Sequence, residues 1–130
     1  MTLKELSQHF KLRERLEKDS QTLASLRAKA HPGAQALTGM PHTPGVSDKV
    51  GDLAIEIADI EERIRHTQEE IDKKADDVAN FINTIDDGYM RTIMRLRFVR
   101  GLTWGEVTYF IGGNNTEGGI KAACYRFLAQ

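Results

Sequence analysis

The side chains that most often do chemistry lie along this chain without the spacing of a catalytic or metal site. The histidines lie on separate segments: His9, His31, His42 and His66. We expect each to be a surface residue. The one cysteine, Cys124, falls on the packed side of a predicted helix, which favours a buried apolar thiol over a nucleophile. Asp76–Asp77 and Asp86–Asp87 are predicted to be helix surface or caps, and no phosphate-loop lysine follows Gly112–Gly113. We therefore predict no enzyme activity, no metal and no cofactor.

The C-terminal third has a different charge from the rest of the chain. Residues 86–130 carry six Lys or Arg against four Asp or Glu, whereas residues 1–85 carry 12 against 15. Seven of the nine aromatic residues also follow position 85. This difference predicts two domains, 1–85 and 86–130. The candidate binding residues of this region are Arg91, Arg95, Arg100, Asn115, Thr116, Lys121 and Arg126.

If these residues bind a nucleic acid, contacts to phosphates are expected to dominate over contacts to bases. They would come from the arginines and from backbone N–H groups at the start of the last predicted helix, near Thr116. For Arg91 and Arg95 the alternative is a solvated face, paired with Asp86 and Asp87.

Two other residues of this region are expected to be structural. Arg97 is predicted to form an ion pair with the preceding coiled coil. Trp104 is predicted to pack at a helix junction, and stacking on a base is the alternative.

Three short helices are expected to position these side chains. The first runs from about residue 89 to residue 100, after the acidic pair at 86–87, and ends at Gly101. The second opens with the capping-box spacing Thr103-x-x-Glu106, and the third starts at Asn115–Thr116. The apolar positions expected to face inward are Tyr89, Ile93, Leu96, Val99, Trp104, Val107, Phe110, Ile111, Ile120, Ala123, Cys124, Phe127 and Leu128. Two short helices around a glycine-containing turn, after a supporting helix, are typical of a helix-turn-helix domain.

The N-terminal region is predicted to begin with a helix of about 29 residues. Thr2-x-x-Glu5 has capping-box spacing, and apolar residues then recur at helical intervals, with Asp19 at a skipped position. The helix is expected to stop at His31-Pro32-Gly33, because proline disfavours helix in the residue before it. Residues 31–46, which hold all three prolines, are predicted to be a linker.

A heptad pattern follows the linker and predicts a coiled-coil helix of about 39 residues. Its seam residues are Val50, Leu53, Ile57, Ile60, Ile64, Ile71, Val78 and Phe81, with Ile85 after them. Thr67 and Lys74 are polar seam positions that would specify register or oligomer state. The expected fold is all-α: a long coiled-coil hairpin of undetermined direction, then a small three-helix domain. We expect the hairpin to associate into a homodimer or higher oligomer.

The composition excludes several classes of protein. The formal net charge is −1, so bulk charge argues for no partner. A single cysteine excludes a disulfide-stapled scaffold and favours a reducing cytoplasm. No apolar run approaches the roughly 20 residues of a membrane span, and the first residues lack a secretory pattern. We expect a cytoplasmic protein with no membrane partner.

Several motifs of the C-terminal region resemble region 4 of the sigma-70 factors. They are Leu96-Arg97-Phe98, Gly101-Leu102-Thr103-Trp104-x-Glu106-Val107, Gly112, Thr116-Glu117 and Ile120. The whole chain is similar to a family of small phage and prophage proteins of Gram-positive bacteria, described as sigma-like or late transcriptional regulators. The resemblance implies a phage-derived, DNA-binding transcriptional regulator in the cytoplasm of a bacterial host cell. The candidate binding residues named above would then contact double-stranded DNA.

The third predicted helix departs from the sigma pattern. Anchored on Ile120, the positions that hold base-contacting side chains in sigma factors are Glu117, Gly118, Gly119, Lys121 and Ala122. Direct base contacts would therefore be few. Two alternatives follow: a protein-interaction module that binds RNA polymerase or a host defence complex, or a small terminase-like component that packages phage DNA.

Overall fold

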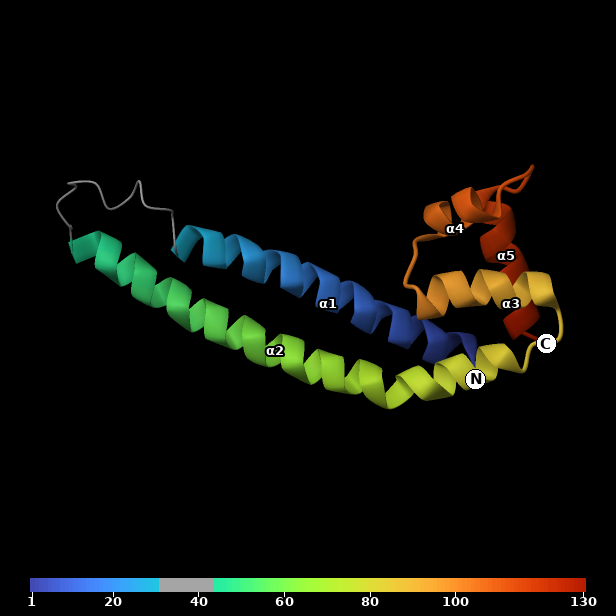
Figure 1. Cartoon of the computed structure of the whole chain (residues 1–130), viewed down its shortest axis with the longest axis horizontal. Coiled ribbons are helices and arrows are strands. Elements are labelled where there is room, and N and C mark those ends of the chain that lie inside the picture. The colour runs from blue at the N-terminus through green and yellow to red at the C-terminus, as the bar shows by residue number, and fades with distance from the viewer. Residues whose placement is uncertain (31–43) are drawn as a thin grey trace. The chain divides into compact units, whose positions relative to one another are not determined.

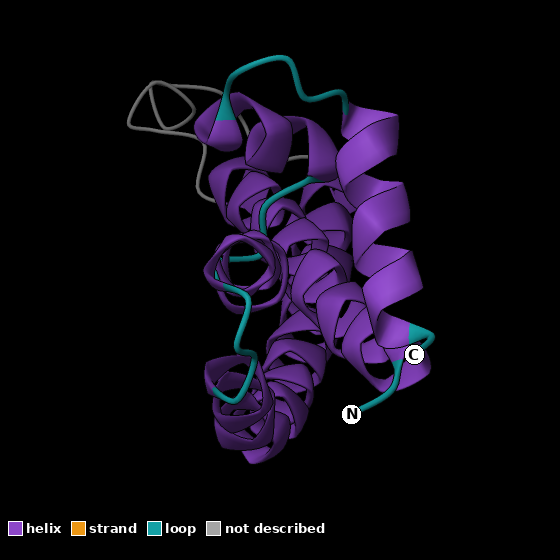
Figure 2. Cartoon of the chain, turned by 90° about the vertical axis from the view of Figure 1, so that its right-hand side faces the viewer, coloured by secondary structure: helices purple, strands orange, loops and turns teal. Residues whose placement is uncertain are grey.

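The described secondary structure of the chain is entirely helical, as predicted (Figure 1). A computed structural model describes the backbone of residues 1–30 and 44–130 and the side chains of residues 1–30 and 53–130. The elements are α1 (Leu3–Ala30), α2 (Pro44–Asn83), α3 (Gly88–Met94), a π-helical turn η2 (Arg95–Val99), α4 (Trp104–Ile111) and α5 (Glu117–Leu128). Loops join α2 to α3, η2 to α4 and α4 to α5 (Figure 2). None of the described helices is long and apolar enough to cross a membrane.

Local side-chain contacts set the helix starts. The predicted capping boxes at both sites are confirmed: Thr2 N–H donates to Glu5 Oε2 at 2.9 Å, and Thr103 N–H donates to Glu106 Oε1 at 3.0 Å. In each box the hydroxyl accepts the reciprocal backbone bond. Asp87 caps α3 by accepting from the backbone of Tyr89 at 3.0 Å. The expected cap role of this carboxylate is therefore confirmed.

The end of α1 and the start of α2 lie at or near their predicted positions. α1 ends at Ala30, as predicted from the proline that follows. α2 begins at Pro44, three residues before the expected start at residue 47. Proline is well accommodated in the first turn of a helix because its missing N–H has no partner there anyway. The rest of the predicted linker, residues 31–43, lies outside the described residues, as do the side chains of residues 44–52, including Val50.

The chain divides into two compact units that do not coincide with the predicted domains. Residues 1–14 and 69–130 form one, which we call the core unit, and residues 15–68 form the other, the paired-helix unit. The predicted boundary at 85/86 lies inside the core unit. The reason is that the first turns of α1 and the last turns of α2 pack in one core with the C-terminal helices.

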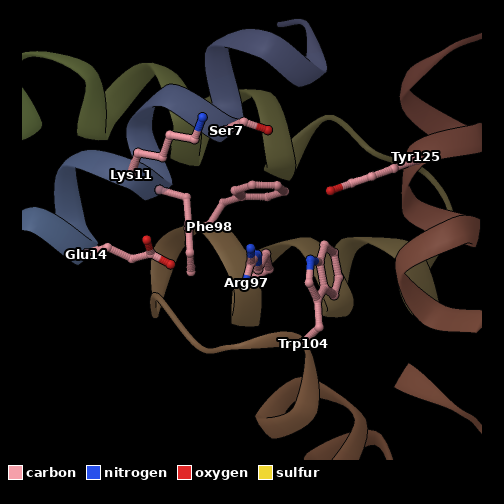
Figure 3. A pocket seen from close by; sticks show the side chains of 8 residues that line it. Ser7, Lys11, Glu14, Arg97, Phe98, Trp104 and Tyr125 are labelled. Carbon is pink, nitrogen blue, oxygen red and sulfur yellow. The ribbon is translucent and has the colours of Figure 1, made fainter. Parts of the chain in front are cut away.

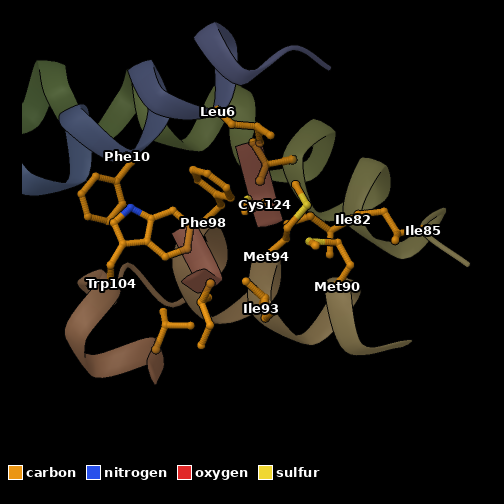
Figure 4. Close-up of a cluster of buried hydrophobic side chains, with 13 residues drawn as sticks. Leu6, Phe10, Ile82, Ile85, Met90, Ile93, Met94, Phe98, Trp104 and Cys124 are labelled. Atoms are coloured by element: carbon orange, nitrogen blue, oxygen red, sulfur yellow. The ribbon is translucent and has the colours of Figure 1, made fainter. Parts of the chain in front are cut away.

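That core is a continuous apolar cluster drawn from every helix (Figure 4). Its buried members are Leu6, Phe10, Val78, Ile82, Ile85, Met90, Ile93, Met94, Phe98, Trp104, Val107, Ile120 and Cys124. Val78 and Ile85, which belong to the predicted seam or follow it, thus pack with the C-terminal helices, and Phe81 is partly buried against the same cluster. Leu6 and Phe10 bring α1 into the same cluster, so the C-terminal helices do not form a separate core.

The π-helical turn changes which face of the α3–η2 segment is buried. The predicted stripe included Tyr89 and Val99, but Tyr89 is exposed and Val99 only partly buried. Arg100 N–H donates to Arg95 O, an i→i+5 bond, at 3.0 Å. Such a wide turn brings residues five apart to the same side, and Ile93 and Phe98 are both buried there. The prediction assumed an uninterrupted α-helix.

Other predicted core positions also differ from the structure. Phe110 was expected inside, but it is 64% exposed, while Trp104 and Val107 of the same helix are buried. On α2, Lys74 is exposed, and Ile82 is buried whereas Phe81 is only partly so. A straight α-helix drifts by about 20° per heptad against a strict seven-residue repeat. The buried stripe therefore departs from the predicted seam at residues 74 and 81, whereas Val78 and Ile85 remain buried.

In the paired-helix unit, charged side chains join α1 and α2. Asp19 is buried and accepts bonds from Nε and Nη2 of Arg63, each at 2.9 Å. Arg27 pairs with Glu61 at 3.1 Å, and both side chains are about half exposed. Residue numbers rise along α1 and fall along α2 between these two pairs, as in antiparallel helices. Ile60 and Thr67 are buried in this unit, and Leu53, Ile57 and Ile64 are half-buried.

Candidate nucleic-acid interface

Arg91 and Arg95, both nominated for DNA contact, are anchored to the end of α2. Arg91 Nη1 donates to Ile85 O at 2.7 Å, and Arg95 Nη2 donates to Asn83 Oδ1 at 2.8 Å. Both acceptors are neutral, so neither bond is an ion pair. The alternative pairing with the acidic residues at 86–87 is not formed. Arg95 thus links η2 to the last residue of α2, and Arg91 links α3 to the loop that follows α2. Arg91 is half-buried and Arg95 is exposed.

Asn115 and Thr116 shape the turn between α4 and α5. Asn115 Nδ2 donates to Gly112 O at 2.9 Å, and Thr116 Oγ1 accepts from Gly119 N–H at 3.0 Å as the N-cap of α5. Gly112 and Gly113 both have φ of 71°, a left-handed conformation that favours glycine. These two polar side chains therefore hold the turn, while the first residues of α5 stay exposed.

The remaining nominated cations are exposed. Lys121 Nζ lies 5.7 Å from the centre of the Tyr125 ring on α5. Arg100, just after η2, and Arg126, near the end of α5, are both exposed. The contacts thus place the nominated residues in separate groups: two at the end of α2, two in the α4–α5 turn and two on α5, with Arg100 after η2.

The basic side chains of residues 86–130 form no ion pair with any carboxylate whose position the structure describes. In the paired-helix unit, by contrast, ion pairs join Arg27 to Glu61, Arg63 to Asp19 and Arg65 to Glu62. The excess positive charge of the C-terminal region is therefore not cancelled by contacts of its own.

The outward face of α5 carries small side chains. Glu117, Gly118, Lys121 and Ala122 are exposed, while Ile120 and Cys124 are buried. A Cβ placed on Gly118 would meet nothing within 4 Å, but one on Gly119 would lie 2.9 Å from the capping hydroxyl of Thr116. Gly119 therefore permits the cap, whereas nothing in the fold requires glycine at 118.

Arg97 does not form the predicted ion pair, and that prediction is wrong. Its guanidinium carbon lies 3.4 Å from the centre of the Phe10 ring and 4.6 Å from that of Trp104. Nη1 donates to Leu102 O at 3.0 Å. Burial lowers the pKa of this guanidinium, and Tyr125 and other groups partly oppose the shift. Aromatic faces on α1 and α4 hold the cation in place of a carboxylate.

Trp104 packs at a helix junction, as predicted. Its side chain is buried and meets Tyr125 of α5 edge to face, with ring centres 6.2 Å apart. Cys124 is also buried as predicted, and burial raises the pKa of its thiol to about 11. A thiol with that pKa is a poor nucleophile at neutral pH.

The prediction that every histidine lies on the surface is wrong for His9. Its side chain is buried, Nε2 accepts from Arg13 Nε at 3.2 Å, and Nδ1 has no hydrogen-bond partner. Burial, followed by the positive charge of Arg13, lowers the pKa of the imidazole. His66 is exposed, and His31 and His42 lie outside the described residues. Among the described residues, no group of three His, Cys, Asp or Glu could hold a metal ion.

Two further surface features were missed by the sequence analysis. One is a pair of exposed aromatic rings on α4, Tyr109 and Phe110, packed edge to face at 5.7 Å. The other is an open pocket where α1 meets η2, α4 and α5 (Figure 3). The pocket combines residues from four elements, so no local motif signals it. The aromatic pair was not predicted because the exposure of Phe110 depends on which face of α4 packs against the core.

Comparison with known protein families, curated proteins and solved structures finds no match to this chain.

Proposed function

We propose that residues 86–130 form a helix-turn-helix domain that binds double-stranded DNA, and that the chain is a phage-derived transcriptional regulator. The observation that carries this proposal is the unpaired positive charge of the region. Its basic side chains make hydrogen bonds to neutral acceptors or none, and no ion pair with a described carboxylate. Such charge is available to displace counterions from a phosphate backbone.

In this proposal α5 is the helix placed against the DNA and α4 supports it. Lys121 and Arg126 on α5, together with Arg100, contact phosphates. The backbone N–H groups at the exposed start of α5 bind one more phosphate. Arg91 and Arg95 act as positioning residues, because their side chains hold the supporting segment to the last residue of α2 and the loop that follows it. Base contacts are few, since the outward face of α5 is mostly glycine and alanine.

Self-association is the second element of the proposal. The α1–α2 pair is proposed to be a coiled-coil hairpin that forms a dimer, so that two weakly binding domains act together through effective concentration. Ile55 supports this idea, because its side chain is 64% exposed on α2. Light scattering tests it: the wild-type chain is expected to be dimeric and Ile55→Glu monomeric, with Glu56→Gln as a neighbouring control. A monomeric wild type contradicts the dimer.

DNA titration tests the central proposal. Labelled phage-genome fragments are titrated with the protein at two salt concentrations. Log affinity should fall linearly with log salt, and Lys121→Gln or Arg126→Gln should each reduce that slope by about 1. Lys29→Gln, an exposed lysine on α1 in the other unit, is the matched control and should leave the slope unchanged. Absence of binding at micromolar protein and low salt would defeat the proposal.

A second candidate function is a protein-interaction module, and the exposed aromatic pair on α4 favours it. Tyr109 is 81% exposed and Phe110 64%. Large aromatic residues are enriched at protein interfaces. The partner proposed from the sequence is RNA polymerase or a host defence complex. Purified RNA polymerase, treated with nuclease, provides the test. Capture that Tyr109→Ser with Phe110→Ser abolishes, and that Lys121→Gln leaves intact, supports this function over DNA binding.

A further inference from the structure

The pocket between α1 and the C-terminal helices has the chemistry of a small-anion site (Figure 3). Its cavity volume is about 160 Å³. The lining residues are Ser7, Phe10, Lys11 and Glu14 of α1, Arg97 and Phe98 of η2, Trp104 of α4 and Tyr125 of α5. All belong to the core unit. Helices on both sides of the pocket thus contribute polar groups.

Arg97 supplies an unmatched positive charge at this pocket. Its guanidinium is held between Phe10 and Trp104 and donates to a single described acceptor, the carbonyl of Leu102. Its Nε is buried without a hydrogen-bond partner. A guanidinium carries five N–H donors, and buried donors are rarely left unpaired. Glu14 also lines the pocket and attracts this cation, but the two side chains form no ion pair.

The other polar groups of the pocket also suit an oxyanion. Lys11 adds a second cation, and Ser7 and Tyr125 add hydroxyl donors. Figure 3 shows the hydroxyl of Tyr125 pointing toward the pocket from α5. Aromatic rings of Phe10, Phe98 and Trp104 form the rest of the wall. Inorganic phosphate is strongly hydrated on all sides, so contact with these rings would cost it hydration without compensation. A carboxylate on an apolar body can bind the polar groups with its oxygens and pack its apolar part against the rings.

We propose that this pocket binds a small free carboxylate whose apolar body is no larger than a benzene ring. The size limit follows from the cavity, because an engineered protein cavity of about 150 Å³ holds benzene. The carboxylate lies toward Arg97, Lys11 and the Tyr125 hydroxyl, and the apolar body lies against the aromatic wall. This proposal does not depend on DNA binding, and each of the two can be tested without the other.

The single tryptophan provides a direct test, because Trp104 lies in the pocket wall. Benzoate is titrated into the full chain while Trp104 fluorescence is recorded, with benzamide as the uncharged isostere. A saturable change with a Kd on the order of 1 mM is expected for benzoate. Benzamide should bind at least about tenfold more weakly, since it lacks the charge-assisted bonds. Equal binding of the two compounds, or no saturable change with benzoate, overturns the proposal.

Substitutions of three pocket-lining residues should change the affinity for benzoate in opposite directions. Lys11→Gln and Tyr125→Phe should each weaken benzoate binding, by about fivefold for one lost hydrogen bond. Glu14→Gln should strengthen it, because it removes the competing carboxylate. These residues are exposed, so the variants should fold, and circular dichroism verifies this.

Two controls separate a built site from general electrostatic attraction. Lys4→Gln makes the same change at an exposed lysine that does not line the pocket and lies two helical turns before Lys11, and Asp86→Asn removes an exposed carboxylate elsewhere in the core unit. Both should leave benzoate affinity unchanged. Equal effects of control and pocket variants overturn the proposal. Inorganic phosphate that binds more tightly than benzoate overturns the assignment to a carboxylate.

Discussion

The two units of this chain are stabilised by different kinds of contact. The core unit buries a continuous apolar cluster that includes Phe98, and a half-buried cation, Arg97, lies between aromatic rings. The paired-helix unit is a single layer of two helices, where buried Asp19 is bound by Arg63. A helix layer without a third partner buries little apolar area, so polar contacts fix its register. The two units should therefore differ in stability and in sensitivity to solution conditions.

The largest effect is expected from truncation of the apolar cluster. Phe98→Ala should lower the free energy of unfolding by about 3–5 kcal/mol, because it removes a fully buried ring and leaves a cavity. Chemical denaturation measures the change. Phe110→Ala is the matched control, and its exposed ring predicts a change within about 0.5 kcal/mol. Similar losses for both variants would contradict the position of the core.

A smaller and more local effect is expected from Asp19→Asn. The substitution removes the charge that Arg63 binds with two hydrogen bonds, and hydrogen exchange should rise in residues 15–30 and 53–68. Glu61→Gln, which breaks the more exposed pair with Arg27, should change exchange little. If Asp19→Asn raised exchange equally in the core unit, the two units would not be energetically distinct.

The two glycines of α5 should respond differently to alanine. Gly118→Ala should stabilise the chain by about 0.5–1 kcal/mol, since helix propensity improves and the site is open. Gly119→Ala should gain less or lose stability, because its Cβ would lie 2.9 Å from Thr116 Oγ1. In a Thr116→Ala background, which itself costs about 1 kcal/mol, Gly119→Ala should become stabilising. Thermal unfolding of this double-mutant cycle tests whether the cap requires the glycine.

The units should also differ in their response to mild acid. The pKa of His9 is lowered in the folded chain, so the unfolded state binds its proton first as the pH falls below about 6.5. Stability of the core unit is therefore complete above that pH and falls below it, until the folded imidazole also titrates. Arg63 lowers the pKa of Asp19, so the contribution of Asp19 persists until the pH falls below the usual carboxyl value of about 3.9.

Unfolding at a series of pH values checks this difference. His9→Gln should flatten the stability profile of the core unit between neutral pH and pH 5, with Asp19 still protecting the paired-helix unit. An unchanged profile in His9→Gln would show that another group titrates there.

Local patterns predicted the helix ends and the fold class but not the buried faces. Thr2, Thr103 and Gly101 were assigned correctly, because a cap or a stop depends on residues within one helical turn. Tyr89, Phe110 and Lys74 were placed on the wrong side, because spacing within one helix does not show which of its faces the other helices cover. On α2 the drift of a straight helix also moves Lys74 out of the buried stripe. For the candidate interface, the sequence indicated which side chains are basic. It did not indicate that Arg91 and Arg95 would be held by the last residue of α2 and the loop that follows it.

The sequence by itself therefore determined that this chain is helical, where most helices start and stop, and that its positive charge gathers after residue 85. Those properties follow from interactions between residues three to five positions apart. Only the tertiary structure decided that Phe10 and Trp104 enclose Arg97, that His9 is buried and that α1 shares a core with α5. Each of these depends on contacts between segments about 90 or more residues apart, or on the fit of several helices at once, which no local spacing encodes.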